Sequence, residues 1–229
     1  MNDALEKNYS RLSAEIRQAA EKAGRDPGSV RLLAVSKKVP AERLRILWGL
    51  GQRLFGENRV QEARIKIPEM PPGGEWHFIG GLQTNKAKEA VEWFDVVESV
   101  DRIELAQELQ KRSEAAGKNL KVLIEVNVGE EAAKHGSKPE DVGVLVAAIN
   151  GMTRLEARGL MAIPPFREDP EEARPFFRKL REIRDSLEQS SGAALPELSM
   201  GMSHDFAVAI AEGATLVRIG TALFGPRSG

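Results

Sequence analysis

The chain has 229 residues, 41% hydrophobic and 29% charged, enough for two small domains or one α/β barrel of the usual size of about 250 residues. Its 33 Lys and Arg residues almost balance its 34 Asp and Glu residues, so the net charge of −1 gives no general attraction to nucleic acid or to a membrane surface. The absence of cysteine excludes disulfides and thiol chemistry, and the lack of a signal-peptide core or of a run of about 20 apolar residues predicts a cytoplasmic protein.

An amphipathic helix opens the chain. Apolar residues at positions 5, 9, 12 and 16 recur at helical spacing, which predicts a helix over residues 3–23 that ends near Gly24. We expect this helix to pack its apolar face on the domain formed by the residues that follow.

Strand-like and helical segments then alternate along the chain. Pro40 and Pro139 stand where helices start, and Asp101 is predicted to cap the helix that follows it. Eight runs rich in Val, Ile and Leu are predicted as strands, at 31–36, 53–56, 76–80, 95–100, 120–128, 155–163, 197–200 and 215–219. Helical patterns lie between most of them, at 41–50, 58–67, 84–92, 102–116, 139–150, 171–189 and 204–212.

Eight alternating units are the number found in a (β/α)8 TIM barrel, and apolar strands suit a parallel sheet that is covered on both faces. A doubly wound open sheet is the competing α/β fold, but it has no simple use for eight such units. No linker, low-complexity tract or change of composition divides the chain. We therefore predict one barrel domain over residues 1–229, with residues 1–26 as an extra N-terminal helix.

The last predicted strand carries a charge that points to a ligand. Arg218 interrupts an apolar strand, and an unpaired buried charge is so costly that this arginine must have a partner. Gly220 and Thr221 follow at the strand tip, where a short helix could begin and offer backbone N–H groups to an anion. Barrels place their chemistry at the carboxyl ends of the strands, so this segment predicts a phosphorylated ligand with a second acceptor within reach of Arg218.

A pair of lysines, Lys37 and Lys38, ends the first predicted strand. Alternation along a strand turns one of them toward the barrel axis and the other away. Adjacent lysines are usually solvated loop residues, but an inward lysine near Arg218 would have a lowered pKa and could form an imine. Because the first and last strands are neighbours in a closed barrel, we expect Lys37 and Arg218 to flank one cavity.

Other strand ends supply further candidates. Ser203 follows the seventh strand, where it either caps a helix or holds phosphate together with the following N–H groups. Asn58, after the second strand, is a better candidate for a ligand contact than Glu57, which the dipole of the next helix would stabilise. His77 is interpreted as a hydrogen-bonded core residue, and no histidine stands at metal-ligand spacing, so no metal is predicted. The loop at 129–136 is interpreted as solvated, with only its position in favour of a lid.

Seven segments, in order between about residues 32 and 225, match a pattern shared within one family. They are AVSK at 34–37, FGENRVQE at 55–62, WHFIG and LQTNK within 76–86, GLMAIP at 159–164, LSMGMS at 198–203 and RIGTALFG at 218–225. With these segments the chain resembles the pyridoxal phosphate homeostasis protein family, which looks like the barrel domain of alanine racemase standing alone.

The resemblance implies a barrel of the alanine racemase N-terminal-domain type whose cofactor is pyridoxal 5′-phosphate (PLP). It implies that Lys37 holds the cofactor as a covalent aldimine, that Ser203, Gly220 and Thr221 bind the phosphate, and that Arg218 faces the pyridine nitrogen. Asn58 completes the predicted cofactor-binding residues. Three positions, Arg59, Gly81 and His204, depart from the family pattern and leave the shape of the site mouth open.

These residues favour a binder over an enzyme. An arginine against the pyridine nitrogen keeps that nitrogen unprotonated, which makes the ring a weaker electron sink. A racemase of this fold needs a base on each face of its substrate, and the two-domain enzyme takes the second, a tyrosine, from an additional domain. We expect that domain to be absent, since the sequence ends four residues after Gly225. The only tyrosine of the chain, Tyr9, is explained by packing in the N-terminal helix. We predict a protein that holds, buffers or delivers PLP without strong catalytic activity.

Two alternatives stay open. A PLP-dependent amino-acid racemase or lyase would use another group as its second base, and a cofactor-free barrel lyase would use Lys37 to form an imine. For the binder, the expected partners are PLP and apo-forms of PLP enzymes, with no nucleic acid and no membrane. Without the dimer-forming second domain, we expect a monomer.

Overall fold

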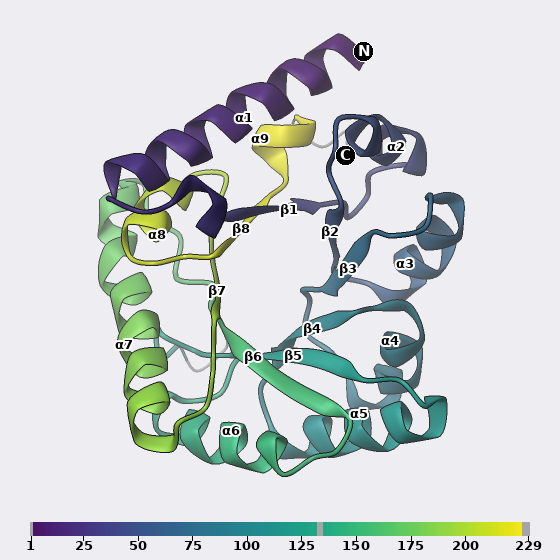
Figure 1. Cartoon of the computed structure of the whole chain (residues 1–229), viewed down its shortest axis with the longest axis vertical. Coiled ribbons are helices and arrows are strands. Elements are labelled where there is room, and N and C mark those ends of the chain that lie inside the picture. Colours follow the sequence, from purple (N-terminus) through teal and green to yellow (C-terminus); the bar gives the residue numbers. More distant parts are fainter. Residues whose placement is uncertain (1, 132–134, 226–229) are drawn as a thin grey trace.

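The computed structural model describes residues 2–131 and 135–225, and eight parallel strands form a closed barrel in it (Figure 1). The strands follow one another in chain order, and the first pairs with both the second and the last. This closure confirms the predicted (β/α)8 fold and rules out an open sheet. The strands are β1 (Arg31–Val35), β2 (Leu54–Glu57), β3 (Glu75–Phe78), β4 (Val96–Val100), β5 (Leu120–Glu125), β6 (Leu155–Met161), β7 (Glu197–Met202) and β8 (Leu216–Ile219).

Helices surround the barrel and cover its outer face (Figure 1). They are α1 (Asn2–Lys22), α2 (Ala41–Gly49), α3 (Val60–Lys66), α4 (Ala87–Trp93), α5 (Ile103–Ala116), α6 (Val142–Asn150), α7 (Arg174–Ser191), α8 (Phe206–Ala211) and α9 (Thr221–Phe224). The first helix, α1, packs on the outside of the barrel, where it contacts α2, α8 and α9. Within residues 2–131 and 135–225, none of the helices combines the length and apolar character needed to cross a bilayer.

Alternation along the strands separates two sets of packed side chains. Outward side chains such as Phe55, Trp76 and Leu198 pack beneath the helices in the main core. Inward side chains fill the barrel axis in two smaller clusters, one of Leu33, Val35, Leu54 and Leu216, the other of Val96, Leu123 and Met161. Toward the carboxyl ends of β1, β7 and β8, the next inward positions are polar or glycine, and the ends of β1 and β8 line the candidate site.

Three predicted helix starts, at 84, 139 and 171, are short 3-10 turns instead, namely η3 (Thr84–Lys86), η4 (Pro139–Asp141) and η5 (Pro170–Ala173). Two further 3-10 turns are η1 (Pro27–Ser29) and η2 (Ile67–Glu69). Pro40 is the N-cap residue of α2, and Pro139 is the first residue of η4, so both prolines stand at helix starts as predicted. The prediction that Asp101 caps α5 is wrong, because Arg102 is the N-cap residue and the Asp101 carboxylate accepts a hydrogen bond from its guanidinium at 2.5 Å.

The predicted loop at 129–136 begins earlier than expected, because β5 ends at Glu125 rather than at residue 128. Two backbone hydrogen bonds, from Val128 to Val126 and from Glu130 to Asn127, turn the chain there. Residues 132–134 of this loop lie outside the described residues, so the idea of a lid stays a prediction.

Candidate functional site

The carboxyl ends of β1 and β8 meet at one cavity. Its volume is about 240 Å³, and it is lined by Lys37, Gly220 and Thr221 together with Val35, Lys38, Val39, Pro40, Arg43, Phe224 and Gly225. Adjacent strands in the closed barrel bring these segments together although they are far apart in the sequence. The predicted amine and the predicted anion-binding strand tip therefore share one cavity.

Lys37 and Lys38 differ in environment. Leu33 and Val35 point inward on β1, so alternation makes Lys37 the next inward position. Lys37 is half-buried, whereas Lys38 is exposed. Lys38 has a φ of 60°, an uncommon value for a residue with a side chain, so the backbone turns directly after Lys37. The Lys38 backbone N–H donates to Glu62 Oε2 at 2.7 Å and fixes this turn. The geometry favours Lys37 as the lysine that faces the barrel mouth.

A hydrogen bond joins the loop after β7 to the tip of β8. The Ser203 hydroxyl accepts from the backbone N–H of Ala222 at 3.2 Å. It does not cap α8, since Asp205 occupies that position. Within the described part of the chain, no acceptor is found for the backbone N–H groups of Ser203, Gly220 and Thr221. Neighbouring backbone donors of this kind suit an anion.

Arg218 lies one inward position below the tip of β8 and is only 4% exposed. Its Nη1 donates to both the carbonyl oxygen and the hydroxyl of Ser199 at 2.7 Å, and its Nη2 donates to the carbonyl oxygen of Ala162 at 2.8 Å. The carboxylate of Glu98 lies 4.0 Å from Nη1. The partner that the buried charge requires is therefore a protein carboxylate. The sequence analysis took the burial of Arg218 as a sign of a ligand, but burial alone does not imply one. A guanidinium carries five N–H donors, and these three bonds leave donors for a ligand.

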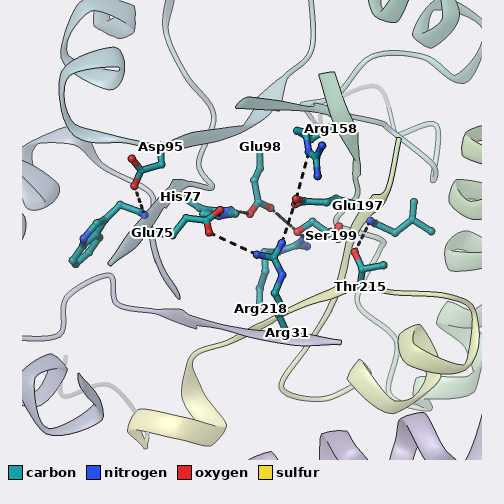
Figure 2. Close-up of polar contacts among 12 residues, drawn as sticks. Arg31, Glu75, His77, Asp95, Glu98, Arg158, Glu197, Ser199, Thr215 and Arg218 are labelled. Carbon is teal, nitrogen blue, oxygen red and sulfur yellow. Dashed lines mark hydrogen bonds and ion pairs between the residues drawn. The ribbon is translucent and has the colours of Figure 1, made fainter. Parts of the chain in front are cut away.

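Below Arg218, inward side chains form a chain of buried charges that the sequence analysis did not predict (Figure 2). Glu98 lies on β4. One of its carboxylate oxygens is 2.5 Å from His77 Nδ1, and the other is 2.5 Å from the Ser199 hydroxyl oxygen. His77 Nε2 lies 3.1 Å from a carboxylate oxygen of Glu75. His77 is thus the hydrogen-bonded core residue that was predicted. Glu98 carries the signal that identified Arg218, a single charge inside an apolar strand.

Glu57 and Asn58 lie on opposite faces at the end of β2. Glu57 points outward and is fully buried, with one carboxylate oxygen accepting from the Ser36 hydroxyl and from Lys66 Nζ, both at 2.7 Å. Burial raises the pKa of Glu57, and Lys66 opposes that rise. Asn58 is half-buried and lines a different cavity, of about 160 Å³, on the side of β3. The structure therefore does not bring Asn58 into the cavity that Lys37 lines.

Of the three positions that depart from the family pattern, Arg59 and Gly81 line the cavity of about 160 Å³ beside Asn58. A Cβ atom on Gly81 would lie 3.2 Å from His135 Nε2, so the His135 ring occupies the space beside this glycine. His204 is exposed, its Nε2 donates to the carbonyl oxygen of Glu168 at 3.0 Å, and its ring packs on Phe166 with ring centroids 5.5 Å apart. Arg59 is exposed at the N-cap of α3.

No group of three or more His, Asp and Glu side chains that could hold a metal ion is found in residues 2–131 and 135–225.

Comparison with known proteins defines the class to which this barrel belongs. The family model described as alanine racemase, N-terminal domain, matches residues 4–228. The pyridoxal phosphate homeostasis protein of Aquifex aeolicus is 49% identical over 219 residues, which cover 95% of this chain and 96% of that protein. The chain therefore belongs to the pyridoxal phosphate homeostasis protein family, as its sequence segments indicated.

Solved structures agree with this assignment. PipY of Synechococcus elongatus with PLP bound is 39% identical, with a TM-score of 0.81, and the match covers 92% of this chain and 100% of that one. The same protein without PLP is 40% identical, with a TM-score of 0.83, and the match covers 91% and 98% of the two chains.

Proposed function

We propose that this protein binds PLP and holds, buffers or delivers it. The observation that carries the proposal is the single cavity lined by Lys37, Gly220 and Thr221. A lysine amine suits the aldehyde of this cofactor, and unpaired backbone N–H groups suit its phosphate. The names of the relatives support the same ligand, since one is a pyridoxal phosphate homeostasis protein and another was solved with PLP bound.

Each residue has a defined task in this proposal. Lys37 would hold the cofactor through its amine, and Ser203, Gly220 and Thr221 would bind its phosphate. Arg218 would face the pyridine nitrogen, and because a guanidinium keeps its protons, that nitrogen would stay unprotonated. The cofactor would supply an electron sink, which such an arginine weakens. Asn58 lines the neighbouring cavity instead, so its contact with the cofactor stays a prediction.

The position of Tyr9 favours a binder over a racemase. Tyr9 lines a cavity of about 720 Å³ together with Arg31 and Leu54, at the amino ends of β1 and β2. Lys37 stands at the opposite end of the barrel, so Tyr9 cannot act as a second base beside it. The relatives' naming as homeostasis proteins supports the same view.

A weak PLP-dependent racemase or lyase is the second candidate, and Glu125 is the observation in its favour. This residue ends β5 and is buried at the barrel mouth. Burial, with a smaller effect of Asp101, raises the pKa of Glu125 to about 7. A carboxyl group that exchanges protons near neutral pH is suited to general acid–base catalysis.

We further propose that the protein acts in the cytoplasm as a monomer and passes PLP to apo-forms of the enzymes that use it. Its balanced charge supports a role without nucleic acid or membrane.

Absorption spectroscopy tests the proposed function. Purified protein mixed with PLP should develop a long-wavelength band, and borohydride should fix the cofactor on a peptide that contains Lys37. Lys37→Ala should abolish the band, whereas Lys38→Ala should retain it. A band that survives Lys37→Ala would contradict the assignment of the lysine. Stereoinversion of L-amino acids at ordinary enzyme rates would contradict the binder and support the second candidate.

A further inference from the structure

Arg218 is held in place by a carboxylate that is itself fully buried. Glu98 stands on β4, which lies opposite β8 in the closed strand order, and its side chain is 0% exposed. One of its oxygens contacts His77 and the other contacts Ser199, with Arg218 at 4.0 Å. Figure 2 shows these four side chains converging in the barrel interior from β3, β4, β7 and β8.

This arrangement keeps Glu98 charged. A carboxylate taken out of water loses several kcal/mol unless it is paired and hydrogen-bonded. Burial opposes the charged form of Glu98, but the hydrogen bond from His77 and the charges of His77 and Arg218 hold its pKa below the ordinary value. Arg218 therefore has a permanent counter-ion that does not depend on a ligand.

His77 is in turn held between two carboxylates. Burial alone would lower its pKa, but hydrogen bonds to Glu75 and Glu98 overcome this effect and raise it to about 9. The imidazole is then positively charged at neutral pH and donates to both neighbours. Charges alternate along Arg218, Glu98, His77 and Glu75, so each residue fixes the next.

We propose that Glu98 and His77 are positioning residues for the PLP site, with Glu98 orienting the Arg218 guanidinium at the floor of the mouth and His77 orienting Glu98. This inference rests on the proposed function, because it assigns to Arg218 the role of facing the cofactor ring. Ser199 and Ala162 supply neutral acceptors for the same guanidinium, and Glu98 supplies the charge that balances it. Removing that charge would change how strongly Arg218 attracts a ring nitrogen.

A matched pair of variants separates positioning from general stability. Glu98→Gln removes the charge and keeps the shape of the side chain. Glu212→Gln makes the same change at another buried carboxylate, which is 3% exposed and pairs with arginines of α7, Arg174 and Arg178 among them, far from the mouth. Both variants remove a buried carboxylate charge that faces arginine, but only Glu98 faces Arg218, whereas the arginines beside Glu212 are partly exposed.

We expect Glu98→Gln to weaken PLP binding by about tenfold, a change of 1.4 kcal/mol, and to shift the absorption maximum of the bound cofactor. Glu212→Gln should leave the affinity within about twofold of the wild type and the spectrum unchanged. Equal effects of the two variants on affinity and spectrum would overturn the positioning role while leaving the proposed function intact. Failure of the wild-type protein to bind PLP would instead overturn both proposals.

A measurement on the wild-type protein without PLP covers the case in which Glu98→Gln does not fold. Nitrogen-15 NMR of the His77 ring should show an imidazolium at pH 7 that titrates well above the ordinary range of histidine. A neutral His77 ring at pH 7 would overturn the proposal, because a neutral ring could not balance two carboxylates.

Discussion

At the scale of single residues, the buried charges of Arg218, Glu98 and His77 are stable because each lies beside a charge of opposite sign. Glu98 stands between Arg218 and His77, and His77 stands between Glu98 and Glu75. The energy lost on desolvation is offset only when such pairs are also hydrogen-bonded. The arginine at the mouth therefore depends on side chains across the barrel for its orientation and its charge balance.

This dependence predicts how stability changes with pH. The pKa of His77 is raised to about 9 in the folded state, mainly by hydrogen bonds that overcome burial, against an ordinary value near 6.5. Its contribution is therefore fully present below about pH 6.5 and is lost as the pH rises through about 9. Glu75 has the opposite sign, because its pKa is lowered to about 2 by the hydrogen bond to His77, so its contribution is lost as the pH falls below about 4.5.

We expect the free energy of unfolding, measured by urea denaturation, to fall by about 3 kcal/mol between pH 6.5 and pH 9 because of His77. In His77→Gln this part of the pH dependence should disappear, although the variant is less stable at every pH. An unchanged slope in the variant over this range would show that another group is responsible.

The sequence analysis identified Arg218 and missed Glu98, although each is a single charge in an apolar strand. Both strands carry this signal, but only Arg218 is followed by residues that also suit an anion, Gly220 and Thr221. A rule that pairs inward charges on different strands would have found Glu98. The pairing itself required the barrel geometry, because β4 and β8 are separated by more than a hundred residues.

At the scale of elements, the site is formed by the tips of strands and the loops that follow them. The tip of β8 and the loop after β7 place the backbone N–H groups of Gly220, Thr221 and Ser203 near one another. Main-chain donors would then bind the phosphate, and the Thr221 side chain would contribute less. This division can be tested because Thr221 is the first residue of α9, a position at which proline is tolerated.

We expect Thr221→Ala to weaken PLP binding by less than about tenfold, since its backbone N–H remains, and Thr221→Pro to weaken it much more, because proline removes that donor. Titration of each variant with PLP, followed by absorbance, measures the two affinities. Equal affinities for Thr221→Ala and Thr221→Pro would show that the backbone donor of Thr221 is not used.

Most elements could be predicted from the sequence, because alternation and helical spacing are strong in apolar segments that face a core. Their ends could not. The start of α5 depends on where Asp101 finds its partner, and the end of β5 depends on turns at Val128 and Glu130 that carry no proline or paired glycine. Lys37 could be assigned to the site from the sequence, whereas Asn58 lines another cavity because the turn after β2 directs it toward β3.

At the scale of the whole molecule, the first helix holds the last one against the barrel. Figure 1 shows α1 lying across the outside of β1 and β8, next to α8 and α9. Asn8 Nδ2 donates to the carbonyl oxygen of Leu223 at 3.1 Å, and Arg11 donates to that of Ala222 at 3.4 Å. Since the Ala222 N–H reaches Ser203, α1 supports the segment proposed to bind the phosphate, although it lies outside the barrel.

Asn8→Ala should therefore lower PLP affinity by a few-fold while costing about 1 kcal/mol of stability, the usual contribution of one hydrogen bond. Lys7→Ala on the same helix is the matched control, because the Lys7 side chain is 74% exposed and pairs only with the equally exposed Asp3 within the described residues. That variant should leave stability within about 0.5 kcal/mol and affinity unchanged. Urea unfolding and PLP titration of both variants measure these effects. If Asn8→Ala lost stability but kept full affinity, α1 would support the fold without supporting the site, and the link from the first helix through α9 to Ser203 would be wrong.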